Sequence, residues 1–345
     1  MTYAVLYHPG HNRVYFEAAL RLAPAEFRVA AERLGLAYAD LQNREICGVN
    51  YLTFKTEETL SAPDIRLLSD LSFAYALFLL EGEGDEPLLK PIARTNERFV
   101  DDGIGAMLKY TGKTNEIFTR MMINFAYCAQ PCEGDLCLLD PVAGKGTTLF
   151  EGLRKGYDVY GIEIGEKVTA EAVRFLQRFL ENAKYKFEYK TIRLSGPGKS
   201  FAAVRHAFEI ARTKQEQKEK HVRTAAFVAG DARHAGSYFK KNTFHMIVGD
   251  LPYGVQHASV TEEKQSPITR SPAELLGACL PAWVEVLRPG GSMVLSWNSN
   301  VLSRERMVAL FEQNGLNVRN ENAYSQFAHR VDQSIVRDIV VANKK

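Results

Sequence analysis

The sequence has no long hydrophobic run and few cysteines. Its most apolar stretch, Leu71–Leu80, is far shorter than the roughly 20 residues that a membrane-spanning helix needs, and the N-terminus lacks a basic stretch followed by an apolar one. The five cysteines are an odd number in a chain of 345 residues, and their spacing fits no paired zinc pattern. We therefore expect a cytoplasmic protein with reduced thiols, no metal centre and no membrane contact.

Two phosphate-binding signatures are also missing. Gly144-Lys145-Gly146 is followed by Thr147, Thr148 and Leu149, so the Gly-x-Gly-x-x-Gly spacing of dinucleotide-binding turns fails. No Gly-Lys-Ser/Thr occurs at Walker A spacing. A nucleoside ligand without a pyrophosphate fits this turn better than a dinucleotide or a nucleoside triphosphate.

The net charge of +2 is small but unevenly distributed along the chain. Residues 184–223 hold eleven Lys/Arg and four Asp/Glu, whereas residues 57–102 hold four and eleven. The basic segment is the best candidate for contact with nucleic-acid phosphates. The alternative is a charged helix that is only solvated, since Glu216 and Glu219 lie among its cations. The cations that could contact phosphate are Arg193, Lys199, Arg205, Arg212 and Lys214.

From about residue 135 onward, apolar strand-like runs alternate with helical patterns, which is typical of βαβ units and a mostly parallel sheet. The predicted strands are 136–140, 157–163, 225–229, 244–249 and 292–297, and the predicted helices are 147–155, 166–183 and 273–287. Residues 316–327 and 333–342 are predicted to form a terminal antiparallel hairpin.

Two regions depart from this alternation. Residues 1–110 indicate a small α+β domain, with strands predicted at 4–7 and 48–54 and helices at 24–34 and 63–79. Residues 185–223 form the basic insertion, which contains a turn at 195–198 and is predicted to continue as a long charged helix. The remainder, residues 111–345, is predicted to be one α/β domain.

Polar residues follow three of the predicted strands. Glycines after the first strand let the backbone approach a ligand closely, and helix N-terminal amides face it. Glu163 ends the second strand, where an acid can accept hydrogen bonds from ribose hydroxyls. Asp231 follows the third strand, where its carboxylate could bind an adenine amino group. The strand ends thus predict a nucleoside-binding edge.

The fourth strand ends in Asp250-Leu251-Pro252-Tyr253-Gly254, a carboxylate followed by a rigid turn that presents an aromatic ring. Active sites of open α/β sheets lie at the carboxyl ends of strands. This segment is therefore predicted to hold a flat ring that bears an amino group.

Taken together, Asp140-Pro-x-Ala-Gly-x-Gly, Glu163, Gly230-Asp231-Ala and Asp250-Leu-Pro-Tyr-Gly resemble motifs of class I S-adenosylmethionine-dependent amino-methyltransferases. The likeness spans roughly residues 110–345, including a helix predicted at 114–126, and is nearest to RNA methylases and THUMP-associated tRNA guanosine methyltransferases. It implies a Rossmann-like, seven-stranded, mostly parallel sheet with the C-terminal hairpin. The residues that it assigns to S-adenosylmethionine are Asp140, Pro141, Ala143, Gly144, Gly146, Thr147, Glu163, Ile164, Asp231 and Ala232.

The same resemblance assigns catalysis to Asp250, Leu251, Pro252 and Tyr253, with the amino group hydrogen-bonded to the Asp250 carboxylate and the Leu251 carbonyl, and with Tyr253 stacked on the base. It predicts methylation of an exocyclic amino group, first of all guanosine in tRNA. Leu251 stands where the family commonly has Pro, which favours RNA over DNA. The alternatives are a DNA adenine or cytosine amino-methyltransferase and a non-enzymatic nucleic-acid-binding protein. The sequence does not define the oligomeric state.

Overall fold

The computed structural model describes residues 1–9, 13–82, 87–94, 98–107, 115–252, 272–325, 327–331 and 333–345. The chain divides into two compact units. One comprises Met1–Glu97 with Asn320–Val331, and the other comprises Arg98–Arg319 with Asp332–Lys345. Among the described residues, no helix is both long enough and apolar enough to cross a membrane.

The first unit contains an antiparallel sheet in the order β2-β3-β1-β4-β5. Its helix α1 packs on β3, where the rings of Phe27 and Phe54 lie 4.5 Å apart. The elements of this unit are β1 (Thr2–Tyr7), α1 (Arg13–Leu34), β2 (Ala39–Ile46), β3 (Val49–Lys55), α2 (Ala62–Ser69), β4 (Ala74–Glu81), β5 (Leu88–Ile92), η4 (Asn322–Ser325) and β14 (His329–Arg330).

The predicted helix at 63–79 is wrong in its second half. Helix α2 ends at Ser69, and the apolar run that follows is strand β4, which pairs with β1 and β5. A short continuous apolar run fits a buried strand as well as a buried helix. Here the run forms a strand because β1 and β5 pair with it on both sides.

The second unit is an α/β domain around a mixed sheet in the order β13-β15-β12-β11-β6-β7-β10-β9-β8. Its elements are α3 (Ile104–Met107), α4 (Glu116–Ala129), β6 (Cys137–Asp140), α5 (Thr147–Arg154), β7 (Asp158–Glu163), α6 (Glu166–Asn182), β8 (Lys186–Ser195), η1 (Pro197–Lys199), β9 (Ala202–Ala211), α7 (Lys214–Lys218), β10 (Arg223–Ala229), η2 (Ala232–His234), α8 (Ala235–Tyr238), β11 (Phe244–Asp250), α9 (Pro272–Val286), β12 (Leu287–Asn298), α10 (Arg304–Gln313), β13 (Leu316–Val318) and β15 (Val336–Lys344).

Strands β6, β7, β10, β11 and β12 are mutually parallel. They follow one another along the chain in the order β6, β7, β10, β11 and β12. In the sheet they lie side by side in the order β10-β7-β6-β11-β12. The order reverses at β6, which places a topological switch point between β6 and β11. Ligands of open α/β sheets bind at such a point, outside the carboxyl ends of the strands.

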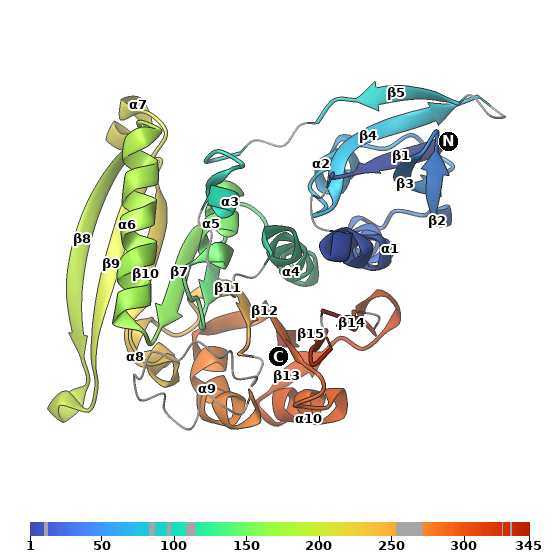
Figure 1. Cartoon of the computed structure of the whole chain (residues 1–345). Helices are drawn as coiled ribbons and strands as arrows, with labels where there is room; N and C mark the ends of the chain where they lie inside the picture. The colour runs from blue at the N-terminus through green and yellow to red at the C-terminus, as the bar shows by residue number, and fades with distance from the viewer. Residues whose placement is uncertain are drawn as a thin grey trace. The chain divides into compact units, whose positions relative to one another are not determined.

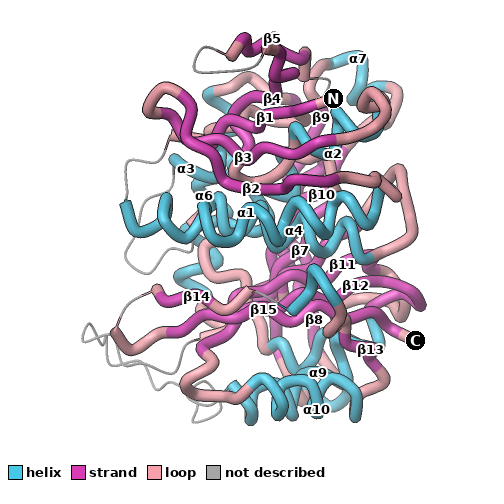
Figure 2. Tube along the Cα trace, turned by 90° about the vertical axis from the view of Figure 1, so that its right-hand side faces the viewer, coloured by secondary structure: helices cyan, strands magenta, loops and turns pink. Residues whose placement is uncertain are grey.

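Helices cover both faces of this sheet. Helix α4 lies on one side of β11 and β12, while α9 and α10 lie on the other (Figure 2). The fully buried Trp283 and Trp297 belong to the core that α9 and α10 form with the strands. Apolar packing on both faces fixes the strand ends at which the predicted site residues lie.

The part of the insertion that follows the turn at 195–198 is not the long helix that was predicted. The insertion forms strands β8 and β9, paired antiparallel over ten residues each, and its helical parts are the short η1 and α7. Phe208 and Ile210 are fully buried whereas Glu209 between them is exposed, which is the period of a strand. The hairpin extends the expected seven-stranded sheet beyond β10 (Figure 1).

The terminal hairpin also differs from its prediction. Its first strand, β13, covers only Leu316–Val318 and pairs antiparallel with β15. Residues 320–331 belong to the first compact unit instead of continuing this strand. Strand β15 is antiparallel to β12 as well, so the reversed strand lies between β12 and β13.

Candidate functional site

Acidic residues mark the carboxyl ends of four neighbouring parallel strands. Asp140 is the last residue of β6, Glu163 of β7 and Asp250 of β11. Asp231 follows β10 by two residues and caps η2. Because β10, β7, β6 and β11 are adjacent in this order, the four carboxyl groups line one edge of the sheet on both sides of the switch point.

Asp140 is buried at the centre of this edge, with 3% of its surface exposed. Its Oδ1 accepts a hydrogen bond from the Val142 amide at 3.0 Å. Burial raises the pKa of Asp140 from 3.8 to about 7, and the negative charges of Asp250 and Glu163 act in the same direction. The carboxyl group is therefore ionised much less readily at neutral pH than an exposed aspartate.

The turn after Asp140 runs from Pro141 to Gly146 and is anchored to β7, since the Ala143 amide donates to the Ile162 carbonyl at 2.9 Å. Gly144 has φ +51° and Gly146 has φ +90°, in the left-handed region that favours glycine. A Cβ on Gly146 would lie 2.9 Å from the Phe227 ring, but one on Gly144 would meet nothing within 4 Å. Gly146 thus permits close packing, while Gly144 borders open space.

Thr147 opens α5 directly after this turn, so the first amides of the helix point toward the same edge. Glu163 accepts hydrogen bonds from the amides of Gly144, at 3.0 Å, and Gly165, at 2.8 Å. Burial raises the pKa of Glu163, and this effect exceeds the lowering that the hydrogen bonds from the amides cause. The next residue, Ile164, is 57% exposed and presents an apolar surface beside the carboxylate.

Asp231 is held by its neighbour Arg233, whose backbone amide and Nε both donate to the carboxylate at 2.9 Å. Burial opposes ionisation here, but the hydrogen bonds from Arg233 prevail and hold the pKa of Asp231 below its ordinary value. The carbonyl of Ala232 accepts a hydrogen bond from Trp283 Nε1 at 3.1 Å. The loop is thereby tied to α9.

Asp250 has two partners that the sequence did not indicate. Ser296 of β12 donates its hydroxyl to Asp250 Oδ1, and Arg337 Nη2 of β15 lies 3.8 Å from Oδ2. The guanidinium of Arg337 also lies over the Phe118 ring, 4.3 Å from its centroid. Ser296 thus holds one oxygen of the carboxylate by a hydrogen bond, and Arg337 places a positive charge near the other.

The turn that follows Asp250 is described only at its start. Leu251 is buried, and its amide donates to the Ser296 carbonyl at 2.9 Å. Pro252 is exposed. Tyr253, the residue predicted to stack on a base, lies outside the described residues.

The five predicted phosphate-binding cations differ in their surroundings. Arg205 donates to the Tyr238 carbonyl and lies 5.1 Å over the Phe239 ring, and burial lowers its pKa. Arg212 pairs with Glu216 at 2.8 Å. Arg193 is exposed on β8, Lys214 is exposed at the start of α7, and the side chain of Lys199 is not described. Arg205 and Arg212 therefore serve contacts within the fold.

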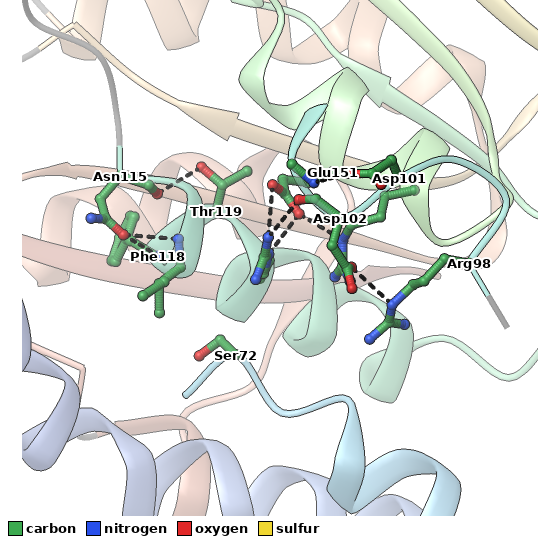
Figure 3. Close-up of polar contacts among 12 residues, drawn as sticks. Ser72, Arg98, Asp101, Asp102, Asn115, Phe118, Thr119 and Glu151 are labelled. Carbon is green, nitrogen blue, oxygen red and sulfur yellow. Dashed lines mark hydrogen bonds and ion pairs between the residues drawn. The ribbon is translucent and has the colours of Figure 1, made fainter. Parts of the chain in front are cut away.

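A buried charge network supports α5, the helix that follows the glycine turn. Glu151 is fully buried between Arg120, at 2.7 Å, and Arg154, at 2.9 Å, and Arg154 also binds Asp102 at 2.7 Å (Figure 3). A Cβ on Gly105 would lie 2.0 Å from Glu151 Oε1, so α3 requires glycine at this contact. The network ties α5 to α4 and to residues 98–107.

The described part of the chain contains no group of three or more His, Cys, Asp or Glu arranged to hold a metal ion.

No family model and no curated protein matches the chain. Among solved structures, it is similar to TrmN from Thermus thermophilus, with 14% identity, a TM-score of 0.43 and coverage of 100% of this chain and 99% of that one. An rRNA methylase from Streptococcus thermophilus gives 12% identity, a TM-score of 0.36 and coverage of 67% and 98%. A TehB-like SAM-dependent methyltransferase from Corynebacterium glutamicum gives 16% identity and a TM-score of 0.35, with coverage of 62% of this chain and 83% of that one. Likenesses this low do not establish an activity, which has to be inferred from the residues of the site.

Proposed function

We propose that the chain is an S-adenosylmethionine-dependent methyltransferase that acts on an exocyclic amino group of an RNA base, with guanosine N2 in tRNA as the first candidate. The observation that carries the proposal is the edge formed by Asp140, Glu163, Asp231 and Asp250 around the switch point, next to the left-handed glycine turn. The reversed strand β15 beyond β12 agrees with the class I methyltransferase sheet expected from the sequence motifs.

The chemistry of this edge fits a cationic nucleoside. S-adenosylmethionine supplies an electrophilic methyl group on a positively charged sulfur, and four carboxyl groups favour a positive charge nearby. Gly144 borders open space for the methionine part, Glu163 would accept hydrogen bonds from the ribose hydroxyls, and the exposed Ile164 would cover the adenine. Asp231 and Ala232 would bind the adenine edge, and Asp140, Pro141, Ala143, Gly146 and Thr147 would shape the turn.

A nicotinamide dinucleotide fits less well. The Gly144 amide, which a pyrophosphate would need, already donates to the Glu163 carboxylate at 3.0 Å. Lys145, the cation of the turn, forms an ion pair with Glu171 at 2.5 Å. A pyrophosphate would therefore meet a negative carboxylate at this turn, which costs binding free energy.

Asp250 would act on the amino group of the base. The nitrogen lone pair of such a group is delocalised into the ring, and hydrogen bonds from its two hydrogens to the Asp250 carboxylate and the Leu251 carbonyl would turn that lone pair toward the methyl group. The cofactor would supply the methyl group, with the electrons of the broken carbon–sulfur bond kept on its sulfur, and the methylated nitrogen would give up one proton to solvent water. Ser296 and Arg337 would keep the carboxylate aligned, which is preorganisation of the kind that lowers reaction barriers.

The proposal can be tested with radiolabelled S-adenosylmethionine and separate pools of tRNA, rRNA, DNA and protein. We expect label in RNA, most of all in tRNA, and its loss in Asp250→Ala. Asp135→Asn, which changes an exposed acid before the amino end of β6, is the matched control and should retain activity. Label in DNA alone would transfer the proposal to DNA, and label in protein alone would overturn it.

Binding of the cofactor can be measured separately by calorimetry. Glu163→Gln should weaken binding of S-adenosylmethionine, because an amide accepts hydrogen bonds from ribose hydroxyls less strongly than a carboxylate does. Wild-type protein that binds neither S-adenosylmethionine nor its demethylated product would exclude the cofactor assignment.

A further inference from the structure

The hairpin of β8 and β9 carries a row of exposed polar and aromatic side chains on one face. Alternation along β8 puts Tyr189, Thr191 and Arg193 on the same face, and the register pairs Thr191 with His206 of β9. We call these four residues the aromatic strip. It belongs to the part of the sheet that the insertion adds beyond β10 (Figure 1).

Tyr189 and His206 form a fixed, flat pair within the strip. Their rings are nearly parallel, with an interplanar angle of 9° and centroids 6.1 Å apart. The Tyr189 hydroxyl lies 2.7 Å from His206 Nδ1 and accepts a hydrogen bond from Thr191 Oγ1 at 3.1 Å. Beside them on the same face, the fully buried Phe208 of β9 pairs directly with Tyr189, and the two ring centroids are 4.8 Å apart.

This pair is held in place yet accessible. Tyr189 is 39% exposed, a large fraction for an aromatic ring that is hydrogen-bonded at its hydroxyl and packed against a buried neighbouring ring. Burial lowers the pKa of His206, so its imidazole is mainly neutral at neutral pH. A rigid, exposed, uncharged ring pair is a surface on which another flat ring can stack.

The strip carries one exposed cation. Arg193 is exposed, and no hydrogen bond or ion pair of its side chain is found among the residues that the structure describes. On the opposite face of β8, by contrast, Lys190 is engaged by Glu188 at 3.2 Å and by Glu209 at 3.8 Å. The cation next to the rings is therefore available to an anionic partner, whereas the cation on the other face is already balanced.

The strip leads toward the candidate site. Strand β8 is antiparallel to β9, which is antiparallel to β10, so β8 and β10 end at the same edge of the sheet. The turn between β8 and β9 is followed by Phe201, whose ring stacks on His234 with centroids 4.7 Å apart and an angle of 26°. Because His234 is three residues beyond Asp231, the end of the hairpin lies beside the proposed adenine-binding loop.

We propose that the aromatic strip binds a single-stranded stretch of the nucleic-acid substrate, with a base stacked on Tyr189 and a phosphate bound by Arg193. The inference rests on the proposed function and specifies how the substrate approaches the site. Single-stranded nucleic acids are bound by just this combination of exposed rings and cations along a strand surface. The excess of cations over acids at 184–223 supplies the complementary charge.

The test measures binding of a fluorescent single-stranded RNA of about 12 nucleotides by anisotropy, without any methyl transfer. Tyr189→Ala should weaken binding roughly fivefold to a hundredfold, and Tyr189→Phe, which keeps the ring, should restore most of it. Arg193→Gln should weaken binding and reduce the salt dependence by roughly 0.7 in log–log slope. Lys190→Gln on the opposite face is the matched control and should change neither quantity.

Several outcomes would overturn the inference. Unchanged affinity in Tyr189→Ala, or an equal loss in Lys190→Gln, would show that the strip does not bind RNA. A wild-type dimer in sedimentation that dissociates in Tyr189→Ala, with RNA affinity unchanged, would instead identify the strip as a contact between copies of the chain. If RNA binding depends on the strip but methyl label appears only in protein, the proposed function fails while the binding surface stands.

Discussion

The buried carboxyl group of Asp140 predicts an unusual stability profile. Its pKa lies near 7 in the folded protein, compared with 3.8 for an unperturbed group. Well below pH 3.8 the group is protonated in both states and contributes no difference. As the pH rises toward 7, the unfolded chain ionises freely while the folded protein resists ionisation, so stability is lost across this window. At about 1.36 kcal/mol per pH unit, the full loss is on the order of 4 kcal/mol.

Asp140→Asn removes the ionisation but keeps an oxygen that can accept the hydrogen bond from Val142. We expect the variant to gain stability over the wild type as the pH rises, by up to about 4 kcal/mol near pH 8, and to lose that gain near pH 4. The assay is urea unfolding followed by tryptophan fluorescence. The two tryptophans of the chain, Trp283 and Trp297, both lie buried in the unit that contains Asp140.

The pH dependence of the stability difference between wild type and Asp140→Asn tests the role of ionisation. A difference that is the same at every pH would reflect only altered packing or hydrogen bonding. Asp135→Asn, at an exposed acid, should show no such dependence. A flat difference between wild type and Asp140→Asn from about pH 4 to about pH 8 would refute the reasoning. If a cationic cofactor binds at this edge, its affinity for the wild type should also rise with pH through about 7, whereas the affinity of Asp140→Asn should not.

Three further predictions address the support of the site. Glu151→Gln leaves two arginines without a buried carboxylate and should cost about 3 to 5 kcal/mol in urea unfolding, whereas the exposed control Glu188→Gln should cost less than about 0.5 kcal/mol. Ser296→Ala removes a hydrogen bond to Asp250 and should lower kcat about tenfold to a hundredfold with cofactor affinity unchanged; an unaltered kcat would count against that role. Gly146→Ala should destabilise the protein by more than Gly144→Ala, since both have positive φ but only the former brings a Cβ to 2.9 Å from a ring; equal losses of stability would contradict this.

Much of the parallel sheet was predictable because its strands are short apolar runs that end in glycine or acidic residues. The five parallel strands and the helices α5, α6 and α9 lie within a few residues of their predicted positions, apart from β12, which begins earlier, whereas the short η2 and α8 between β10 and β11 were not predicted. The insertion was mispredicted because its charged residues suggested a solvated helix, while the alternation of Phe208, Glu209 and Ile210 decided for a strand. No local signal indicates that residues 320–331 join the first unit, since that depends on packing with residues far away in the sequence.

The residues of the candidate site likewise fall into those that the sequence predicts and those that depend on strand pairing. Residues such as Glu163 and Asp250 could be predicted because each follows its own strand, and parallel strands bring their carboxyl ends to one edge. Ser296 could not, because its role depends on the register that places it opposite Asp250. Slipping that register by one residue would turn Ser296 to the other face of the sheet, and nothing in the sequence of β12 fixes the register by itself. The partners of a predicted catalytic residue are therefore determined by strand pairing, and they become visible only once the sheet is assembled.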